Sequence, residues 1–194
     1  MTDTTILQRS RGRPRDVGKD IAIRDAAWRV LAERGFDGLT FEAVAELANC
    51  SRATLYRRYA SKVALVSAVL YETSRSVEPE IAPGSAPRDV LVAHACAAAD
   101  YLSGYRGQAL LNLTTAAFRH PELAAATASF GESEQAFYLN EFSRIAPEAD
   151  SGGLAFACDT LLGSIIYHVS MKQRALAAPD VMRLVDCAIA TLRD

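Results

Sequence analysis

The segment 40–62, TFEAVAELANCSRATLYRRYASK, gathers hydroxyl, phenol and basic side chains within a few turns of chain. Thr40 and Ser51 are good N-cap residues, so they predict two short helices separated by a tight turn. The second helix presents Arg52 and Arg57, with hydroxyl groups beside them. Such side chains on a helix about 10 Å wide suit the base edges and phosphates of a DNA major groove. The segment therefore has the pattern of a helix-turn-helix.

The turn between the two short helices contains Asn49 and Cys50. A tight turn needs a residue that tolerates a positive φ, and asparagine is the best substitute for glycine there. We expect Asn49 to adopt that conformation and Cys50 to fill a small space in the core. Leu55 and Tyr59 are also expected to face the core, which leaves the basic side chains of the second helix outside.

The elements that position this segment are predicted to be helices throughout, so the expected fold class is all-α. Alanine is the commonest residue and β-branched alternation is scarce, which favours a period of 3.6 over a period of 2. Gly35 is expected to end the first helix, and Pro79, Pro83 and Pro87 form the strongest break along the chain. The predicted helices cover residues 20–34, 41–48, 52–59, 61–77, 88–102, 105–118, 121–144, 153–172 and 179–193.

The composition is that of a folded protein whose charge is unevenly distributed. The 194 residues are 50% hydrophobic and 23% charged, with a formal net charge of −2. Residues 1–62 hold 12 Lys and Arg against 8 Asp and Glu, while the remainder holds 9 against 15, which gives +4 and −6. This separation of charge is expected where one part of a chain meets a polyanion.

Other classes of protein are disfavoured by what the sequence lacks. The longest uncharged runs have 12 residues, whereas a membrane-spanning helix needs roughly 20 apolar residues, and no secretory signal is evident. We therefore expect a cytoplasmic protein with no membrane partner. The four cysteines are far apart, His94, His120 and His168 are dispersed, and no nucleotide-binding or hydrolase motif occurs. We expect no metal, no cofactor and no enzymatic activity.

Residues 20–70 resemble the DNA-binding domain of TetR-family transcriptional regulators. The resemblance implies an N-terminal three-helix helix-turn-helix domain over residues 20–78, with the motif itself at about 41–60. It also implies a larger C-terminal helical domain over residues 88–194 for effector binding and dimerisation. The pieces that match are Ala26-Ala27, Gly35-Phe36, Leu39-Thr40, Val44-Ala45, Ser51-Arg52-Ala53-Thr54-Leu55-Tyr56-Arg57-Arg58-Tyr59 and Ser61-Lys62. The family usually has Gly, His and Phe where this chain has Asn49, Arg58 and Tyr59, and Arg58 adds a charge near the DNA backbone.

The resemblance implies roles for individual side chains, and their chemistry supports those roles. Arginine pairs bidentately with guanine, and a methyl group packs against thymine. Phenol, hydroxyl and ammonium groups donate hydrogen bonds to phosphate oxygens. The expected base contacts are Arg52, Ala53, Thr54 and Arg57. The expected phosphate contacts are Thr40, Tyr56 and Lys62. Ser51 lies at the start of the second short helix, which we call the reading helix because it would contact the bases.

A basic arm over residues 1–19 precedes the first helix. Its run Arg11-Gly-Arg-Pro-Arg resembles the core of an AT-hook, in which extended arginines enter a narrow A·T minor groove. Arg13 lies at the centre of this run and is the expected contact. The alternative is a basic tail that adds only nonspecific, salt-sensitive affinity.

The C-terminal two-thirds are expected to supply a dimer surface and an effector pocket. A reader of palindromic double-stranded DNA needs two recognition helices about 34 Å apart, and the last two helices are the candidates for homodimerisation. A central core helix is the alternative for the apolar stripes of residues 153–172. Aromatic residues that are candidates for lining a pocket, although core packing is their commoner role, are Tyr101, Phe118, Phe130, Phe137 and Tyr138.

These features together predict a homodimeric repressor that binds a palindromic operator and is released by a small hydrophobic effector. An activator or an effector-independent regulator is the alternative within DNA binding. A helical small-molecule-binding protein or enzyme, whose front segment only resembles a helix-turn-helix, is the alternative from another class.

Overall fold

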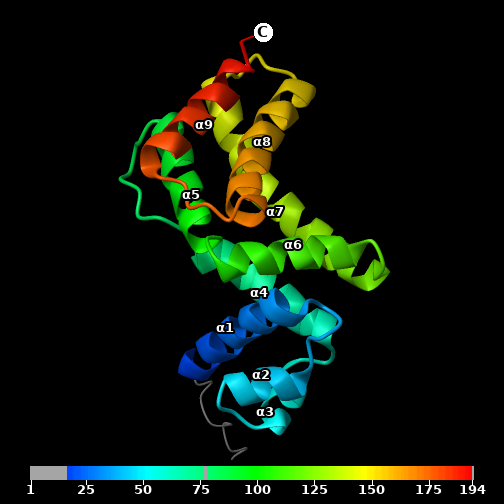
Figure 1. Ribbon diagram of the computed structural model, residues 1–194. Helices are drawn as coiled ribbons and strands as arrows, with labels where there is room; N and C mark the ends of the chain where they lie inside the picture. Colours follow the sequence, from blue (N-terminus) through cyan, green and yellow to red (C-terminus); the bar gives the residue numbers. More distant parts are fainter. Residues whose placement is uncertain (1–16, 77, 194) are drawn as a thin grey trace, which may run out of the picture.

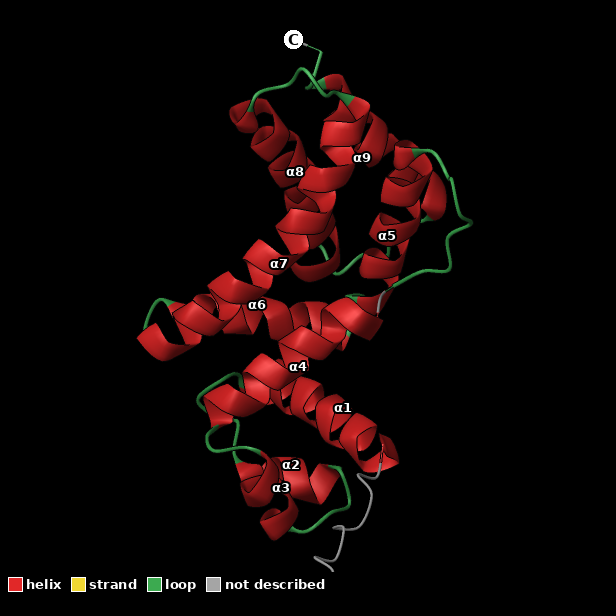
Figure 2. Cartoon of the chain, turned by 180° about the vertical axis from the view of Figure 1, so that it is seen from behind, coloured by secondary structure: helices red, strands yellow, loops and turns green. Residues whose placement is uncertain are grey.

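The computed structural model describes residues 17–76 and 78–193, and their secondary structure is entirely helical, as the sequence predicts. Figures 1 and 2 show an elongated molecule, with α2 and α3 at one end, α5, α8 and α9 at the other, and α6 across the middle. The helices are α1 Val17–Arg34, α2 Phe41–Leu47, α3 Arg52–Arg58, α4 Lys62–Ser76, α5 Pro87–Tyr101, α6 Tyr105–Ala117, α7 Pro121–Ile145, α8 Ser151–Ile166, the π-helix η1 Tyr167–Met171, and α9 Ala178–Ala190.

Local signals in the sequence set the helix boundaries near α1–α4. Thr40 Oγ1 accepts a hydrogen bond from the Ala43 amide at 3.1 Å, and Ser51 Oγ accepts one from the Thr54 amide at 3.2 Å. Both predicted N-caps are therefore confirmed. Gly35 ends α1 with φ of 65°, and Asn49 holds the turn before α3 with φ of 49°, as predicted.

One hydrophobic core joins α1–α4 to α6 and to the first turn of α7. Ile23, Leu31 and Leu55 are fully buried in it, and so is Leu113 of α6. Two hydrogen bonds from the Asn112 amide reinforce this contact, because they reach the carbonyls of Leu31 and Ala32 at the end of α1 at 2.9 and 3.1 Å. The N-terminal helices are therefore packed on the rest of the chain through α1 on α6 and α4 on α7.

A second core joins α5, α7, α8 and α9. Leu91, Phe142, Leu161 and Val185 are all fully buried, one from each of these helices. An ion pair reinforces the packing of α5 on α9: the Arg88 guanidinium donates two hydrogen bonds to the Asp186 carboxylate, at 2.7 and 2.9 Å. This pair holds the pKa of Asp186 below its usual value.

The predicted helix over residues 153–172 is divided in the structure. α8 ends at Ile166 and continues as the π-helix η1, which packs against α6. By length and composition alone, the continuous stretch Ser151–Met171 would suffice to cross a membrane, with a mean hydropathy of 1.4 over its most apolar window. Only 33% of that window is buried. A long apolar helix is thus left partly uncovered in the single chain.

Close packing at the junction of α6 and η1 predicts a requirement for Gly107. A Cβ atom there would lie 2.5 Å from the Leu102 carbonyl oxygen and 2.9 Å from that of Val169, whereas a Cβ at Gly131 of α7 would meet nothing within 4 Å. Gly107→Ala should therefore lower the free energy of unfolding, measured by urea denaturation, although alanine is the better helix former. Gly131→Ala is the control and should raise it by up to about 1 kcal/mol. Equal effects of the two changes would contradict the packing.

Candidate nucleic-acid interface

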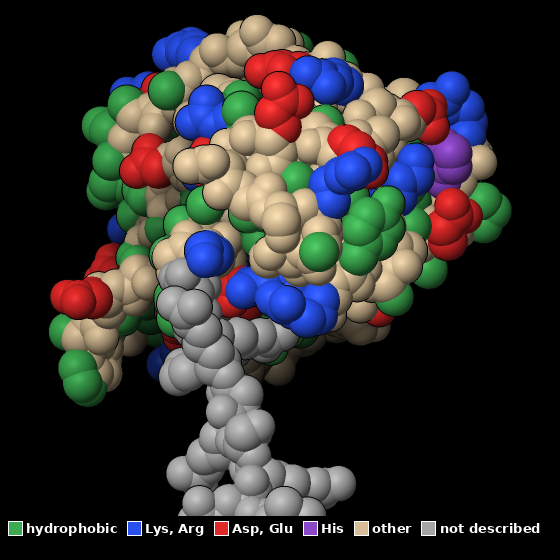
Figure 3. All heavy atoms as spheres, turned by 90° about the horizontal axis from the view of Figure 1, so that it is seen from below, with side chains coloured by type: hydrophobic (Ala, Val, Ile, Leu, Met, Phe, Trp, Pro, Cys, Tyr) green, Lys and Arg blue, Asp and Glu red, His purple; other side chains and the backbone are tan. Residues whose placement is uncertain are grey.

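Helix α3 presents a polar face to solvent at the end of the molecule. Arg52, Ala53, Tyr56 and Arg57 are exposed, whereas Leu55 is fully buried beneath them. Figure 3 views this end from below and shows Lys and Arg side chains gathered on it, with a few acidic side chains among them. The structure thus brings the four predicted base-reading positions to one short helix, with Thr54 half-buried beside Ser51.

Two of the hydroxyl groups predicted to be near DNA also stabilise helix starts. Ser51 and Thr54 are joined by a hydrogen bond of 2.9 Å between their side-chain oxygens, in addition to the N-cap bond. Thr40 accepts the amide of Ala43 and keeps its own hydroxyl proton free to donate to an acceptor. These residues therefore fix the backbone of α2 and α3 and still expose polar groups at the same end.

Contacts between α2 and α3 orient the exposed side chains. The Tyr56 ring packs edge-on against the Phe41 ring, with centroids 4.9 Å apart. The Arg52 guanidinium lies 3.5 Å from Glu42 Oε1, so it is held near α2 by an exposed ion pair. Glu42 was not expected at this site, because nothing local in the sequence pairs positions 42 and 52.

The Lys62 side chain, which is predicted to contact a DNA phosphate, already has contacts within the protein. Its Nζ donates a hydrogen bond to the Phe36 carbonyl oxygen at 3.2 Å and lies 4.1 Å from the centre of the Phe36 ring. The first residue of α4 is thereby tied to the loop between α1 and α2. The remaining ammonium protons are available to another acceptor.

Arg58 has a structural partner rather than a free guanidinium. It forms an ion pair with Asp20 of α1, and the two side chains are only 12% and 21% exposed. The added charge that the sequence places near the DNA backbone is therefore neutralised within the domain, where it ties the end of α3 to the start of α1. Arg13 and the rest of the basic arm before residue 17 lie outside the described residues.

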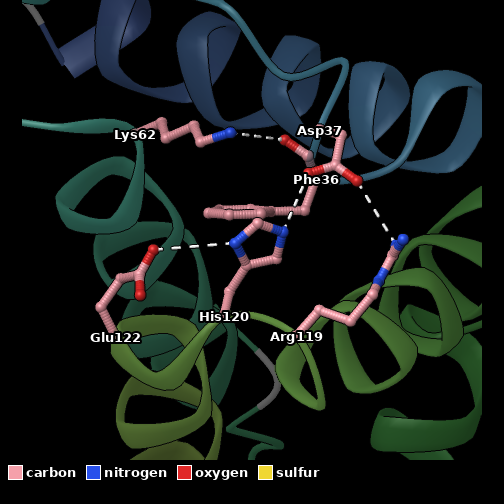
Figure 4. A network of polar contacts seen from close by, with 6 residues as sticks. All are labelled: Phe36, Asp37, Lys62, Arg119, His120 and Glu122. Atoms are coloured by element: carbon pink, nitrogen blue, oxygen red, sulfur yellow. Dashed lines mark hydrogen bonds and ion pairs between the residues drawn. The ribbon is translucent and has the colours of Figure 1, made fainter.

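A polar network joins the helix-turn-helix region to the corner between α6 and α7 (Figure 4). Asp37, in the loop after α1, lies 2.9 Å from His120 Nε2 and 3.4 Å from the Arg119 guanidinium. The His120 ring also packs edge-on against Phe36 at 4.9 Å. Because Phe36 contacts Lys62, these side chains connect the α6–α7 corner to the first turn of α4.

A cavity of about 430 Å³ lies among α5, α6, α7 and α8, on the far side of α6 from the reading helix. Of the five candidate aromatic residues, Phe130 and Tyr138 line it. Phe118 is 92% exposed at the end of α6, Tyr101 packs against the Arg106 guanidinium, and Phe137 packs against His94. The structure thus separates the candidates into two that face one cavity and three that do not.

The fold and this exposed helix define a helical protein with a helix-turn-helix of the type that reads DNA. The family model for bacterial regulatory proteins of the tetR family matches residues 23–69. Residues 23–69 therefore form a DNA-binding domain of the tetR family, as the sequence motif indicated. The relatives reported below are transcriptional regulators rather than enzymes, which agrees with the predicted class.

Individual proteins are similar to this chain in part of their sequence or in their fold. The uncharacterised helix-turn-helix-type regulator YdeS of Bacillus subtilis is 36% identical over 118 residues, which is 61% of this chain and 59% of YdeS. The DNA-binding transcriptional repressor TetR of Mycobacteroides abscessus is 32% identical over 75 residues, covering 39% of this chain and 40% of that protein. Each match therefore covers less than two-thirds of the relative's length. A solved Rhodococcus structure assigned to the TetR family shares the fold, with a TM-score of 0.73, 18% identity, and coverage of 91% of this chain and all of that one.

The different environments of Arg57 and Arg58 predict different effects of removing them. Arg58→Ala removes the ion-pair partner that the structure describes for Asp20, whose side chain is only 21% exposed, so it should lower the free energy of unfolding by about 1–3 kcal/mol. Arg57→Ala should leave that free energy unchanged, because the Arg57 side chain is exposed. Thermal or urea denaturation measures both. A stable Arg58→Ala protein would show that the ion pair does not hold α3 to α1.

Proposed function

We propose that this protein is a repressor that binds a palindromic operator as a homodimer and is released by a small hydrophobic effector. The observation that carries the proposal is the exposed polar face of α3, held on the core by Leu55 and presented with Arg52, Tyr56 and Arg57 outward. α3 would enter the major groove while α2 crosses the backbone. The similarity to the repressor TetR of Mycobacteroides abscessus supports repression rather than activation. In this role the protein would act in the cytoplasm, where the DNA is.

In this proposal the contacts divide into those that read bases and those that position the helix. Arg52, Ala53, Thr54 and Arg57 face base edges, with Ser51 fixing the start of the helix. Thr40, Tyr56 and Lys62 contact phosphates. Arg13 of the arm enters the adjacent minor groove.

The dimer is proposed to form through α8 and α9. Apolar side chains remain exposed on these helices and on η1 in the single chain, and a partner copy would cover them. The exposed apolar residues that do not line the cavity among α5–α8 are Phe156, Tyr167, Met171 and Met182.

The effector is proposed to occupy the cavity among α5–α8. Its volume lies in the range of small-molecule sites. Phe130 lines this cavity and also a second hollow between α4 and α7, beside Ser67 and Leu70 of α4. An occupant that displaces Phe130 therefore acts on α4, and a shift of the α6–α7 corner acts on Phe36 and Lys62. Changing the angle of α4 would alter the spacing of the two reading helices and release DNA.

The assignment of roles predicts that two changes on α3 affect DNA binding differently. Arg52→Ala should reduce the preference for the operator over a random duplex by about 1–3 kcal/mol, because a base contact is lost. Tyr56→Phe removes only a hydroxyl that donates to phosphate and keeps the ring packed on Phe41. It should therefore weaken binding to the operator and to the random duplex equally, by about 1 kcal/mol. Both effects are measured by fluorescence anisotropy, with the DNA that flanks the gene for this protein as the operator and a random duplex for comparison. Equal losses on both duplexes from Arg52→Ala would contradict its role in reading bases.

The dimer surface predicts a second pair of contrasting variants. Phe156→Arg places a charge on the exposed apolar side of α8 and should convert the protein to a monomer in sedimentation velocity. Phe118→Arg changes an even more exposed phenylalanine at the end of α6, away from this surface, and should leave a dimer. A wild-type monomer at all concentrations, or a dimer that only Phe118→Arg dissociates, would refute the proposed interface.

A further inference from the structure

The cavity among α5–α8 is mostly apolar, and its polar lining side chains are Glu134, Gln135 and Tyr138 of α7 and Asp159 of α8. Its ionisable carboxylates are Glu134 of α7 and Asp159 of α8, and no lysine, arginine or histidine of the described chain lines it. Asp159 accepts a hydrogen bond from the Gln135 amide at 3.1 Å. Within the part of the chain that the structure describes, neither carboxylate has a basic partner within 4.0 Å. Glu134 is half-buried and Asp159 is exposed, so the cavity has two carboxylates at its lining with no basic side chain of the described residues paired to them.

Aromatic groups complete the lining. Tyr138 is only 2% exposed, and its hydroxyl forms no hydrogen bond with the described part of the chain. Burial, with a smaller contribution from the charge of Glu134, raises the pKa of Tyr138, so the phenol is neutral and its oxygen is available as an acceptor. Phe130 and Tyr138 both line the cavity, and the face of an aromatic ring attracts a cation when water is excluded.

We propose that the effector of this protein is an organic cation with an apolar body, such as a protonated lipophilic amine. Glu134 and Asp159 would bind the positive group. The apolar body would pack against the aliphatic side chains of the lining, which are Ala98, Leu102, Leu110 and Leu162. An anionic ligand of the same shape meets two carboxylates and no basic group. This inference rests on the proposed function, because it assigns a ligand chemistry to the cavity proposed as the effector site.

The test compares three ligands that share one apolar body: 4-tert-butylbenzylamine, 4-tert-butylbenzyl alcohol and 4-tert-butylbenzoate. Isothermal titration calorimetry of the full chain near neutral pH should show the protonated amine binding at least tenfold more tightly than the alcohol, and the benzoate most weakly. Glu134→Gln should reduce the affinity for the amine at least tenfold and leave that for the alcohol unchanged. Glu132→Gln is the matched control, because Glu132 is an exposed carboxylate of α7 that does not line the cavity.

Thermal denaturation of both variants checks that they fold. No binding of the amine, equal or tighter binding of the benzoate, or an unchanged amine affinity in folded Glu134→Gln would overturn the inference. Operator binding, followed by anisotropy in the same solutions, separates this result from the proposed function. An amine that binds through Glu134 without releasing DNA would support the cation site and refute effector release. A benzoate that binds better and releases DNA would do the reverse.

Discussion

The packing of α6 against α1 is the contact on which the rest of the structure depends. Small side chains such as Ala109 and Ala116 let the two helices approach, and Asn112 satisfies two carbonyls at the end of α1. The Tyr105 hydroxyl donates to Asp25 beside Arg29, at the other end of the same interface. One side of α1 therefore packs within the helix-turn-helix domain, and its other side packs on α6, which borders the cavity.

This shared core gives a physical basis for coupling between the two ends of the molecule. The reading helix α3 is short and has few buried side chains of its own, so its position follows from α1, α2 and α4. Those helices in turn contact α6 and α7 through the first core and through the Asp37–His120 network. A rearrangement at the cavity can therefore reach α3 through helices that contact one another directly. A flexible linker between independent domains would not transmit it.

The sequence predicts the helices well because their ends depend on local chemistry. Thr40, Ser51 and Gly35 each determine a boundary through a backbone hydrogen bond or a positive φ, and Asn49 does so for the turn. Contacts between distant residues have no such signal. The Asp20–Arg58 pair, the inclusion of α6 in the first core and the separation of Tyr138 from the exposed Phe118 depend on three-dimensional packing, and so does the π-helix after Ile166. Fold class and reading helix were therefore predictable, whereas the lining of the cavity was not.

The central claim is that α1–α4 and α6 form one cooperative unit, and native-state amide hydrogen exchange tests it most directly. The slowest amides of α1, around Ala27 and Leu31, should exchange with the same free energy of opening as those of α6 around Ala109 and Leu113. That result would show that the DNA-reading helices do not unfold without the helix beside the cavity. Exchange of α1–α4 at a clearly lower free energy, with α6 still protected, would contradict the account.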